Sequence, residues 1–293
     1  MRCLSIALLF LFQFFTGLQT NAQPAKTVNK NSAAATKTNA APLSVQAMFE
    51  RFFALSDGDT VQLIEKSRLG LNICKTDPAS KYCTYVSAWG NIVSKKFQVG
   101  LNGIEKLERD YPDWAEVYFL HAQYFVHKEE TGYIEQAQKC IELNPLLVQP
   151  CFFLASHYEE LQNYKLSLVY YNQLEKIDSK HQSLYYNRAS VKGKSGDYEG
   201  AILDYTKALQ NNPAHSRALF NRGHAYMNLK DYVNATTDFD AFLKIMPKYA
   251  LAYYYRGAAK YYQDNKTAAC EDMKIASDLG HSGATSFINS YCK

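Results

Sequence analysis

Residues 183–213 read SLYYNRASVKGKSGDYEGAILDYTKALQNNP, and residues 217–247 repeat the same plan as RALFNRGHAYMNLKDYVNATTDFDAFLKIMP. Small residues recur outward from this stretch at steps of 33 or 34 residues, at Ala54, Ala88, Ala122, Ala155, Ala189, Gly223 and Gly257. Prolines follow most of them about 24 residues later, at Pro78, Pro112, Pro145, Pro213 and Pro247. One small residue and one helix stop per period are typical of stacked helical hairpins.

Further positions of the period agree between units. Alanine stands at unit position 20 in Ala201, Ala235 and Ala269, and an aromatic at position 24 in Tyr205 and Phe239. On these residues the chain resembles the tetratricopeptide repeat family, in its exported bacterial type. The resemblance spans roughly residues 47–283 and is specific from Val148 onward, because Lys66 and Gly100 replace the alanine earlier. It implies an all-α fold: a right-handed superhelical solenoid of about seven antiparallel helix pairs with a C-terminal capping helix.

The N-terminal residues have a different character. Residues 1–22 combine Arg2, an apolar run from Leu4 to Phe15 and small residues before Gln23, which predicts a cleaved signal peptide. Residues 23–44 contain three lysines and no acid, and we expect a flexible linker there. The remainder divides into divergent repeat units at 45–147, well-formed units at 148–283 and a cap at 284–293. We therefore expect export to a periplasm or the medium, with no stable transmembrane segment after signal removal.

The charge distribution argues against a nucleic-acid partner. The net charge is +4, and Arg2 with the three linker lysines accounts for all of it. The folded body is therefore neutral, and it lacks the basic surface that nucleic acid requires.

Six cysteines lie beyond the predicted signal peptide in three pairs that are close in sequence: Cys74 with Cys83, Cys140 with Cys151, and Cys270 with Cys292. The first two pairs flank turns between units, and the third would tie the last repeat to the closing segment. In an exported chain all three pairs are candidate disulfides. The alternative is that these cysteines are buried thiols that pack as small apolar side chains. Their spacing does not fit a zinc site, so we expect no metal.

The resemblance also implies a binding groove, because the family's first helices line a concave face into which unit position 5 points. Position 5 is aromatic in six units: Tyr85, Phe119, Phe152, Tyr186, Phe220 and Tyr254. Such a column suits an extended peptide or a partner helix. The other groove candidates are Asn187, Arg217, Asn221, His224 and Tyr261. The alternative is that the rings and the asparagines serve packing between units.

No catalytic motif is present: the chain has no HExxH, no GxSxG and no glycine-rich phosphate loop. Carboxylates such as Asp238 and Asp240 are expected on solvated helix faces. We predict a non-catalytic scaffold without a cofactor that binds a peptide or helix of an envelope protein. One alternative is a carbohydrate- or cell-wall-binding module that uses the tyrosine-rich C-terminal end, where Tyr254 with Tyr261 or Tyr262 is the expected exposed set. The other is a structural subunit of an envelope complex.

Overall fold

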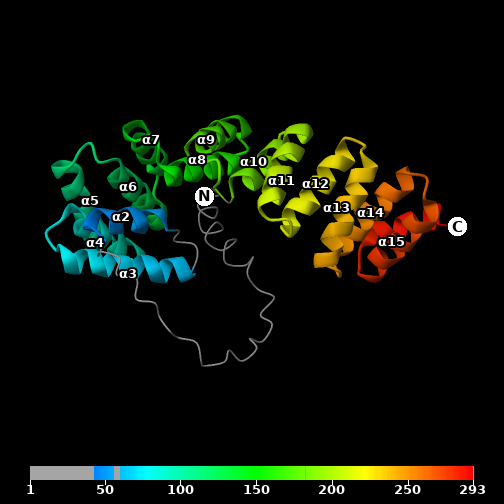
Figure 1. The fold of residues 1–293 in the computed structure, drawn as a ribbon, viewed down its shortest axis with the longest axis horizontal. Coiled ribbons are helices and arrows are strands. Elements are labelled where there is room, and N and C mark those ends of the chain that lie inside the picture. The colour runs from blue at the N-terminus through cyan, green and yellow to red at the C-terminus, as the bar shows by residue number, and fades with distance from the viewer. Residues whose placement is uncertain (1–42, 56–59, 182, 293) are drawn as a thin grey trace, which may run out of the picture. The chain divides into compact units, whose positions relative to one another are not determined.

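The structure is a computed structural model that describes residues 43–55, 60–181 and 183–292. The predicted signal peptide and nearly all of the predicted linker lie outside these ranges. The described residues form helices and contain no strand (Figure 1). The helices are α2 (Val45–Ala54), α3 (Thr60–Thr76), α4 (Lys81–Val93), α5 (Phe97–Asp110), α6 (Ala115–Lys128), α7 (Tyr133–Leu143), α8 (Val148–Glu160), α9 (Tyr164–Ile177), α10 (Leu184–Lys194), α11 (Tyr198–Asn211), α12 (Ser216–Asn228), α13 (Tyr232–Ile245), α14 (Ala250–Tyr262), α15 (Lys266–Asp278) and α16 (Ser282–Tyr291).

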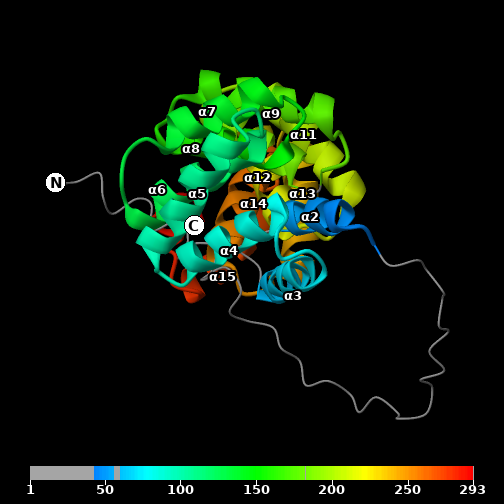
Figure 2. The same cartoon turned by 90° about the vertical axis from the view of Figure 1, so that its left-hand side faces the viewer.

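These helices form seven successive pairs, from α2–α3 to α14–α15, and α16 packs on α15 as a final helix. The predicted seven units and capping helix are therefore confirmed. The chain divides into two compact parts, a C-terminal unit from Cys151 and an N-terminal unit up to Pro150. Within the C-terminal unit, α11 packs on α12 and α13 packs on α14, so neighbouring pairs bury one another's faces. Within the N-terminal unit, α3 lies beside α4 (Figure 2).

The turns inside the six pairs from α4–α5 to α14–α15 share one backbone feature. One residue adopts a left-handed backbone, with φ between 56° and 88°, at Lys95, Glu129, Gln162, Gly196, Lys230 and Asp264. Only Gly196 is the residue type that this conformation favours. The second helix then begins at a side-chain cap that accepts from the N–H three residues on, at Asn163, Asp197, Asp231 and Asn265. The turns thus share the period of the sequence repeat.

The small residues of the 34-residue ladder lie where the two helices of a pair cross. Six of the seven, from Ala88 to Gly257, are buried. A Cβ added at Gly223 would lie 3.0 Å from the ring of Phe239. Ala54 is the exception: it is exposed at the C-terminal end of α2, so its predicted place at a close crossing is wrong. The first pair has diverged from the geometry of the others.

A ladder of ion pairs joins the helices of the C-terminal unit. Arginines at unit position 7 donate through Nε to aspartates 16 residues later, at 2.7–2.9 Å, in the pairs Arg188–Asp204, Arg222–Asp238 and Arg256–Asp272. Each arginine also donates through Nη1 to a side chain 16 residues earlier, Asn172, Thr206 and Asp240 in turn. Each guanidinium therefore links three helices. The expected solvated position of Asp238 is wrong, because this carboxylate is buried against Arg222.

Two of the three cysteine pairs are bridged. Disulfides join Cys74 to Cys83 and Cys270 to Cys292, and the second ties α15 to the end of α16. Cys140 and Cys151 are present as thiols and belong to no disulfide among the described residues, in contrast to the candidate bridge. Both side chains are completely buried, and burial raises the pKa of the Cys151 thiol to about 11. These two cysteines pack as small apolar residues.

Candidate functional site

Four of the six predicted column aromatics lie in the C-terminal unit, at Phe152, Tyr186, Phe220 and Tyr254, and all four are half-buried. Each ring packs against the ring that directly precedes the next first helix, at centroid distances of 5.4, 4.6, 5.5 and 4.3 Å. Those partners are His181, His215, Tyr249 and His281. The column is therefore part of the packing between repeats, and each ring remains partly accessible.

The two candidate asparagines have different surroundings. Burial raises the pKa of Tyr186 and of Tyr205, and the neighbouring Asn221 side chain acts in the opposite direction on both. Asn187 lies one repeat earlier on α10, and its side chain is half-buried with no hydrogen bond to any described residue. Asn221 thus lies beside two tyrosine hydroxyls, whereas the amide of Asn187 can bind a peptide backbone.

Arg217 is an exposed cation on the first helix of the next repeat. It lies in the first turn of α12 and forms no ion pair with a described residue. Its charge acts on the Tyr186 hydroxyl, although burial has the larger effect and raises the pKa of that tyrosine. His224, two turns further along α12, is half-buried with its ring against Tyr255 at 5.2 Å. Arg217 and Asn187 therefore offer polar groups beside the partly accessible Tyr186 ring.

A polar contact connects two neighbouring first helices of the same unit. Lys194 on α10 reaches Glu159 on α8 at 2.8 Å, and Ser190 donates to the same carboxylate oxygen at 3.4 Å. These residues occupy positions that the resemblance assigned to the groove. The predicted surface is therefore of mixed charge, with Glu159 already paired and Arg217 not.

The tyrosine-rich end differs from its prediction. Tyr254 stacks on His281, and Tyr261 packs against Phe287 at 5.1 Å, so both are half-buried. The exposed rings are Tyr262, which is 61% exposed, and Tyr291, which is 55% exposed. The fold of α16 over α14 explains the change, because it covers the face that carries Tyr254 and Tyr261.

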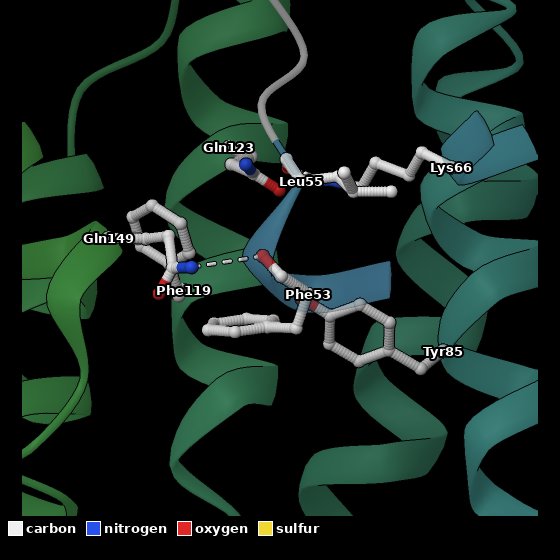
Figure 3. A pocket seen from close by; sticks show the side chains of 7 residues that line it. All are labelled: Phe53, Leu55, Lys66, Tyr85, Phe119, Gln123 and Gln149. Carbon is white, nitrogen blue, oxygen red and sulfur yellow. Dashed lines mark hydrogen bonds between the residues drawn. The ribbon is translucent and has the colours of Figure 1, made fainter. Parts of the chain in front are cut away.

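The remaining two column residues lie in the N-terminal unit and are covered. Tyr85 is 2% exposed and Phe119 is 7% exposed. The ring of Phe53, from the end of α2, lies 6.4 Å from Tyr85 and 6.1 Å from Phe119. Gln149 donates from Nε2 to the carbonyl oxygen of Phe53 at 3.1 Å (Figure 3). The chain's own first described helix thus occupies this part of the column, which therefore has no open groove.

A small cavity of about 180 Å³ remains beside this contact, lined by Phe53, Leu55, Lys66, Tyr85, Phe119, Gln123 and Gln149 (Figure 3). Lys66 is buried, and its ammonium donates to the carbonyl oxygen of Leu55 at 3.2 Å. The ammonium also lies 4.9 Å from the ring centroid of Phe52 and 5.2 Å from that of Trp89. This cation–π contact explains how a lysine is accommodated where later repeats have alanine.

His215 has the geometry of a pH-sensitive helix cap. It precedes α12, and its Nδ1 accepts a hydrogen bond from the backbone N–H of Ala218 at 3.2 Å. Burial lowers the pKa of His215 below its usual range. The unfolded chain therefore takes up a proton before the folded chain does.

The neutral His215 cap stabilises the fold. We expect its contribution to the free energy of unfolding to be complete above about pH 6.5, the ordinary pKa of histidine, and to decline as the pH falls below it. The His215→Asn variant keeps a capping acceptor but does not titrate there. Between about pH 7.5 and about pH 5, thermal unfolding should therefore show a smaller loss of stability in the variant than in the original chain. Other titrating groups, such as Glu160, whose pKa burial and Glu159 raise to about 7, are common to both proteins. An equal loss in the two proteins would contradict the prediction.

Among the described residues, no group of three or more His, Cys, Asp or Glu side chains is placed to hold a metal ion. No helix in the described part of the chain is long and apolar enough to cross a membrane.

The repeats are also recognised by comparison with known proteins. Residues 182–215 and 216–249 each match the family model described as tetratricopeptide repeat. These two segments are tetratricopeptide repeats (TPRs). No curated protein matches this TPR chain in sequence. The two matched segments coincide with the α10–α11 and α12–α13 pairs, which carry the ion-pair ladder.

Several crystal structures share the TPR fold. That of YrrB, described as a TPR protein with an unusual peptide-binding site, is 20% identical, with a TM-score of 0.59 over 64% of this chain and 97% of that chain. That of MamA is 18% identical, with a TM-score of 0.54 over 59% of this chain and 96% of the other. MamA 41-end from Desulfovibrio magneticus RS-1 is 16% identical, with a TM-score of 0.53 over 58% of this chain and 97% of the other. At these identities the likeness establishes the fold alone.

Proposed function

We propose that this TPR protein is an exported, non-catalytic scaffold that holds a peptide segment or a helix of an envelope protein. The binding surface is formed by the first helices of the C-terminal unit, around Tyr186, Asn187 and Arg217. One observation carries the proposal. The partly accessible ring of Tyr186 lies next to the amide of Asn187 on α10 and near the guanidinium of Arg217 on α12. Neither the amide nor the guanidinium has a hydrogen-bond or ion-pair partner among the described residues. A planar guanidinium and an amide suit the carboxylates and backbone groups of a peptide.

Two further observations support this proposal. A TPR crystal structure that shares the fold is described as having a peptide-binding site. The disulfides Cys74–Cys83 and Cys270–Cys292 suit the oxidising compartment to which the predicted signal peptide would lead.

The test places a photo-crosslinking amino acid at Asn187 and, as a matched control, at Lys176, which is exposed in the last turn of α9. We expect an envelope protein to be crosslinked from position 187 and not from position 176. Arg217→Glu should abolish that crosslink, whereas Lys176→Glu should leave it unchanged. The column rings are unsuitable for this purpose because their loss would disturb packing. The same crosslinks from both positions, or none from position 187, would refute the proposed surface.

The exposed rings of Tyr262 and Tyr291 favour a second candidate, a carbohydrate- or cell-wall-binding module at the C-terminal end. Tyr262 stacks on Tyr232 at 4.8 Å, so one ring face is held in place while the side chain stays largely exposed. Aromatic faces of this kind can carry a sugar ring. In a sedimentation assay with isolated cell wall, this candidate requires that Tyr262→Ala abolish binding and that Arg217→Glu leave it intact. A structural subunit of an envelope complex would retain its interactions in both variants.

A further inference from the structure

Three aromatic rings surround the ammonium group of Lys81 in the N-terminal unit. Nζ of Lys81 lies 4.4 Å from the ring centroid of Trp114. The same nitrogen lies 5.3 Å from the ring centroids of Tyr82 and Tyr111. These two tyrosine rings stand at 88° and 80° to the plane of Trp114. Two walls and a floor therefore enclose one cation, and we call Tyr82, Tyr111 and Trp114 the Lys81 cage.

The cage is held in place by contacts that do not involve Lys81. The rings of Trp114 and Tyr82 both pack against Phe49 of the buried core, at centroid distances of 5.4 and 4.9 Å. The backbone N–H of Trp114 donates to the carbonyl oxygen of Tyr111 at 3.0 Å, which fixes the turn that carries both rings. The three rings should therefore keep their positions when the Lys81 side chain moves away.

The repeat architecture does not account for Tyr111. This residue ends α5, whereas Asn144, Asp178 and Asn212 end the later second helices α7, α9 and α11. Each of those three side chains accepts a hydrogen bond from the backbone N–H two residues further on, at 3.0–3.2 Å. A phenol ring cannot form this bond, and Tyr111 is 41% exposed. This turn therefore lacks a stabilising hydrogen bond and carries an exposed ring, which indicates that Tyr111 has a role outside the turn.

Two carboxylates make the surroundings of the cage negative. Glu116 lies in the first turn of α6, and burial raises its pKa, whereas the charge of Lys81 lowers it. Burial also raises the pKa of Tyr82, and the charges of Glu116 and Glu50 add to this effect. The cage thus combines aromatic faces with acidic neighbours, and both features favour a cation.

Lys81 is a poor match for the site that it occupies. Its ammonium group has three N–H donors and is strongly hydrated in water, yet it forms no hydrogen bond or ion pair with a described residue. Lys81 is also the first residue of α4, where the helix dipole disfavours a cation. A trimethylammonium group carries the same charge without any N–H donor. Aromatic faces can therefore surround it without leaving donors unpaired.

We infer that the Lys81 cage binds the trimethylammonium group of a choline-type compound, and that Lys81 is a weaker internal occupant which this ligand displaces. The four-carbon stem of lysine is flexible, so its ammonium can move into solvent while the rings stay in place. Glu50 and Glu116 balance the charge of whichever cation is bound. This inference does not depend on the proposed peptide surface, which lies in the C-terminal unit.

Isothermal titration with choline chloride tests the inference on the chain from Gln23 onward, which contains every described residue. Choline should bind. Its neutral isostere 3,3-dimethyl-1-butanol, in which a tert-butyl group replaces the trimethylammonium, should bind at least about tenfold more weakly. Lys81→Ala removes the competing ammonium and should tighten choline binding at least about threefold. Failure of the original chain to bind choline, or equal binding of the two compounds, overturns the inference. So does a Lys81→Ala variant that binds choline no more tightly.

Tyr111→Asn tests the cage without endangering the fold, because it supplies the residue type that ends α7 and α11. It should weaken choline binding at least about fivefold. The matched control, Tyr262→Asn, replaces another exposed tyrosine and should bind choline like the original chain. A Tyr111→Asn variant that is folded by circular dichroism and binds choline undiminished would also overturn the inference.

Sedimentation with vesicles separates the two sources of a trimethylammonium group. If a lipid headgroup is the ligand, phosphatidylcholine vesicles should sediment the protein and phosphatidylethanolamine vesicles, which carry a primary ammonium, should not. Tyr111→Asn should then abolish the difference between the two lipids. If a free compound is the ligand, choline should bind in solution and neither kind of vesicle should sediment the protein.

Discussion

Replacing Asp204 by alanine is expected to lower the free energy of unfolding of the C-terminal unit by about 3–5 kcal/mol. This carboxylate is 2% exposed, accepts from Arg188 Nε at 2.7 Å and Nη2 at 2.9 Å, and lies 2.8 Å from Lys192 Nζ. Its removal leaves a buried guanidinium without its bidentate partner. Glu175, which lies 2.5 Å from Arg188, still balances part of the guanidinium charge in this variant. The expected loss of unfolding free energy is therefore near the lower end of that range. Urea unfolding followed by circular dichroism measures the loss.

Two controls separate the buried pair from ordinary surface charge. Lys194→Ala breaks the partly exposed pair with Glu159 of the preceding repeat and should cost about 1 kcal/mol or less. The double variant Arg188→Met/Asp204→Leu removes both buried charges and should recover a large part of the loss, because apolar side chains can replace a buried ion pair at little cost. Equal losses for Asp204→Ala and Lys194→Ala would show that the ladder does not stabilise the repeats.

The repeat architecture could be predicted because its signals are local and recur. Each hairpin after the first carries its own small residue at the crossing, and most carry a proline after the second helix, so one well-formed unit identifies the register of its neighbours. The ion-pair ladder recurs at the same 34-residue period, but the prediction from sequence did not include it. Arg188, Arg222 and Arg256 are 34 residues apart, and their aspartates follow each by 16 residues. Taken one at a time, charged residues such as Asp238 suggest a solvated face, whereas their shared period indicates a common structural partner.

The covering of Tyr85 and Phe119 by α2 could not be predicted in this way. The contact between Gln149 and Phe53 joins residues 96 positions apart, and it has no counterpart at the repeat period. It depends on the path of a first helix that has left the regular geometry, as the exposure of Ala54 shows. Sequence periodicity identifies which residues face the groove side of each repeat. It does not reveal that another part of the same chain already occupies that side.

Replacing Gly257 by leucine is expected to destabilise the last repeat by about 1–3 kcal/mol or more. A Cβ at this position would lie 3.1 Å from the carbonyl oxygen of Ala269, 3.1 Å from the Cβ of Asp272 and 3.2 Å from the terminal methyl of Met273. All three neighbours lie on helix α15, and the carbonyl oxygen of Ala269 and the Cβ of Asp272 can move only with its backbone. Asp272 is itself fixed by Arg256. The isobutyl group can therefore enter only by separating α14 from α15. Thermal unfolding of the variant should show the loss.

Gly193 supplies the matched control for this prediction. It lies on α10, and a Cβ there would meet only the Cβ of Ala201, at 3.9 Å, which is ordinary contact. Gly193→Leu should leave stability unchanged or raise it by up to about 1 kcal/mol, because leucine favours a helix more than glycine does. Both substitutions replace a helical glycine by a residue of higher helix propensity, so a loss that only Gly257→Leu shows reports the close crossing. Similar unfolding temperatures for the two variants would mean that the α14–α15 crossing has more space than the structure shows, and that the glycine ladder does not set the distance between paired helices.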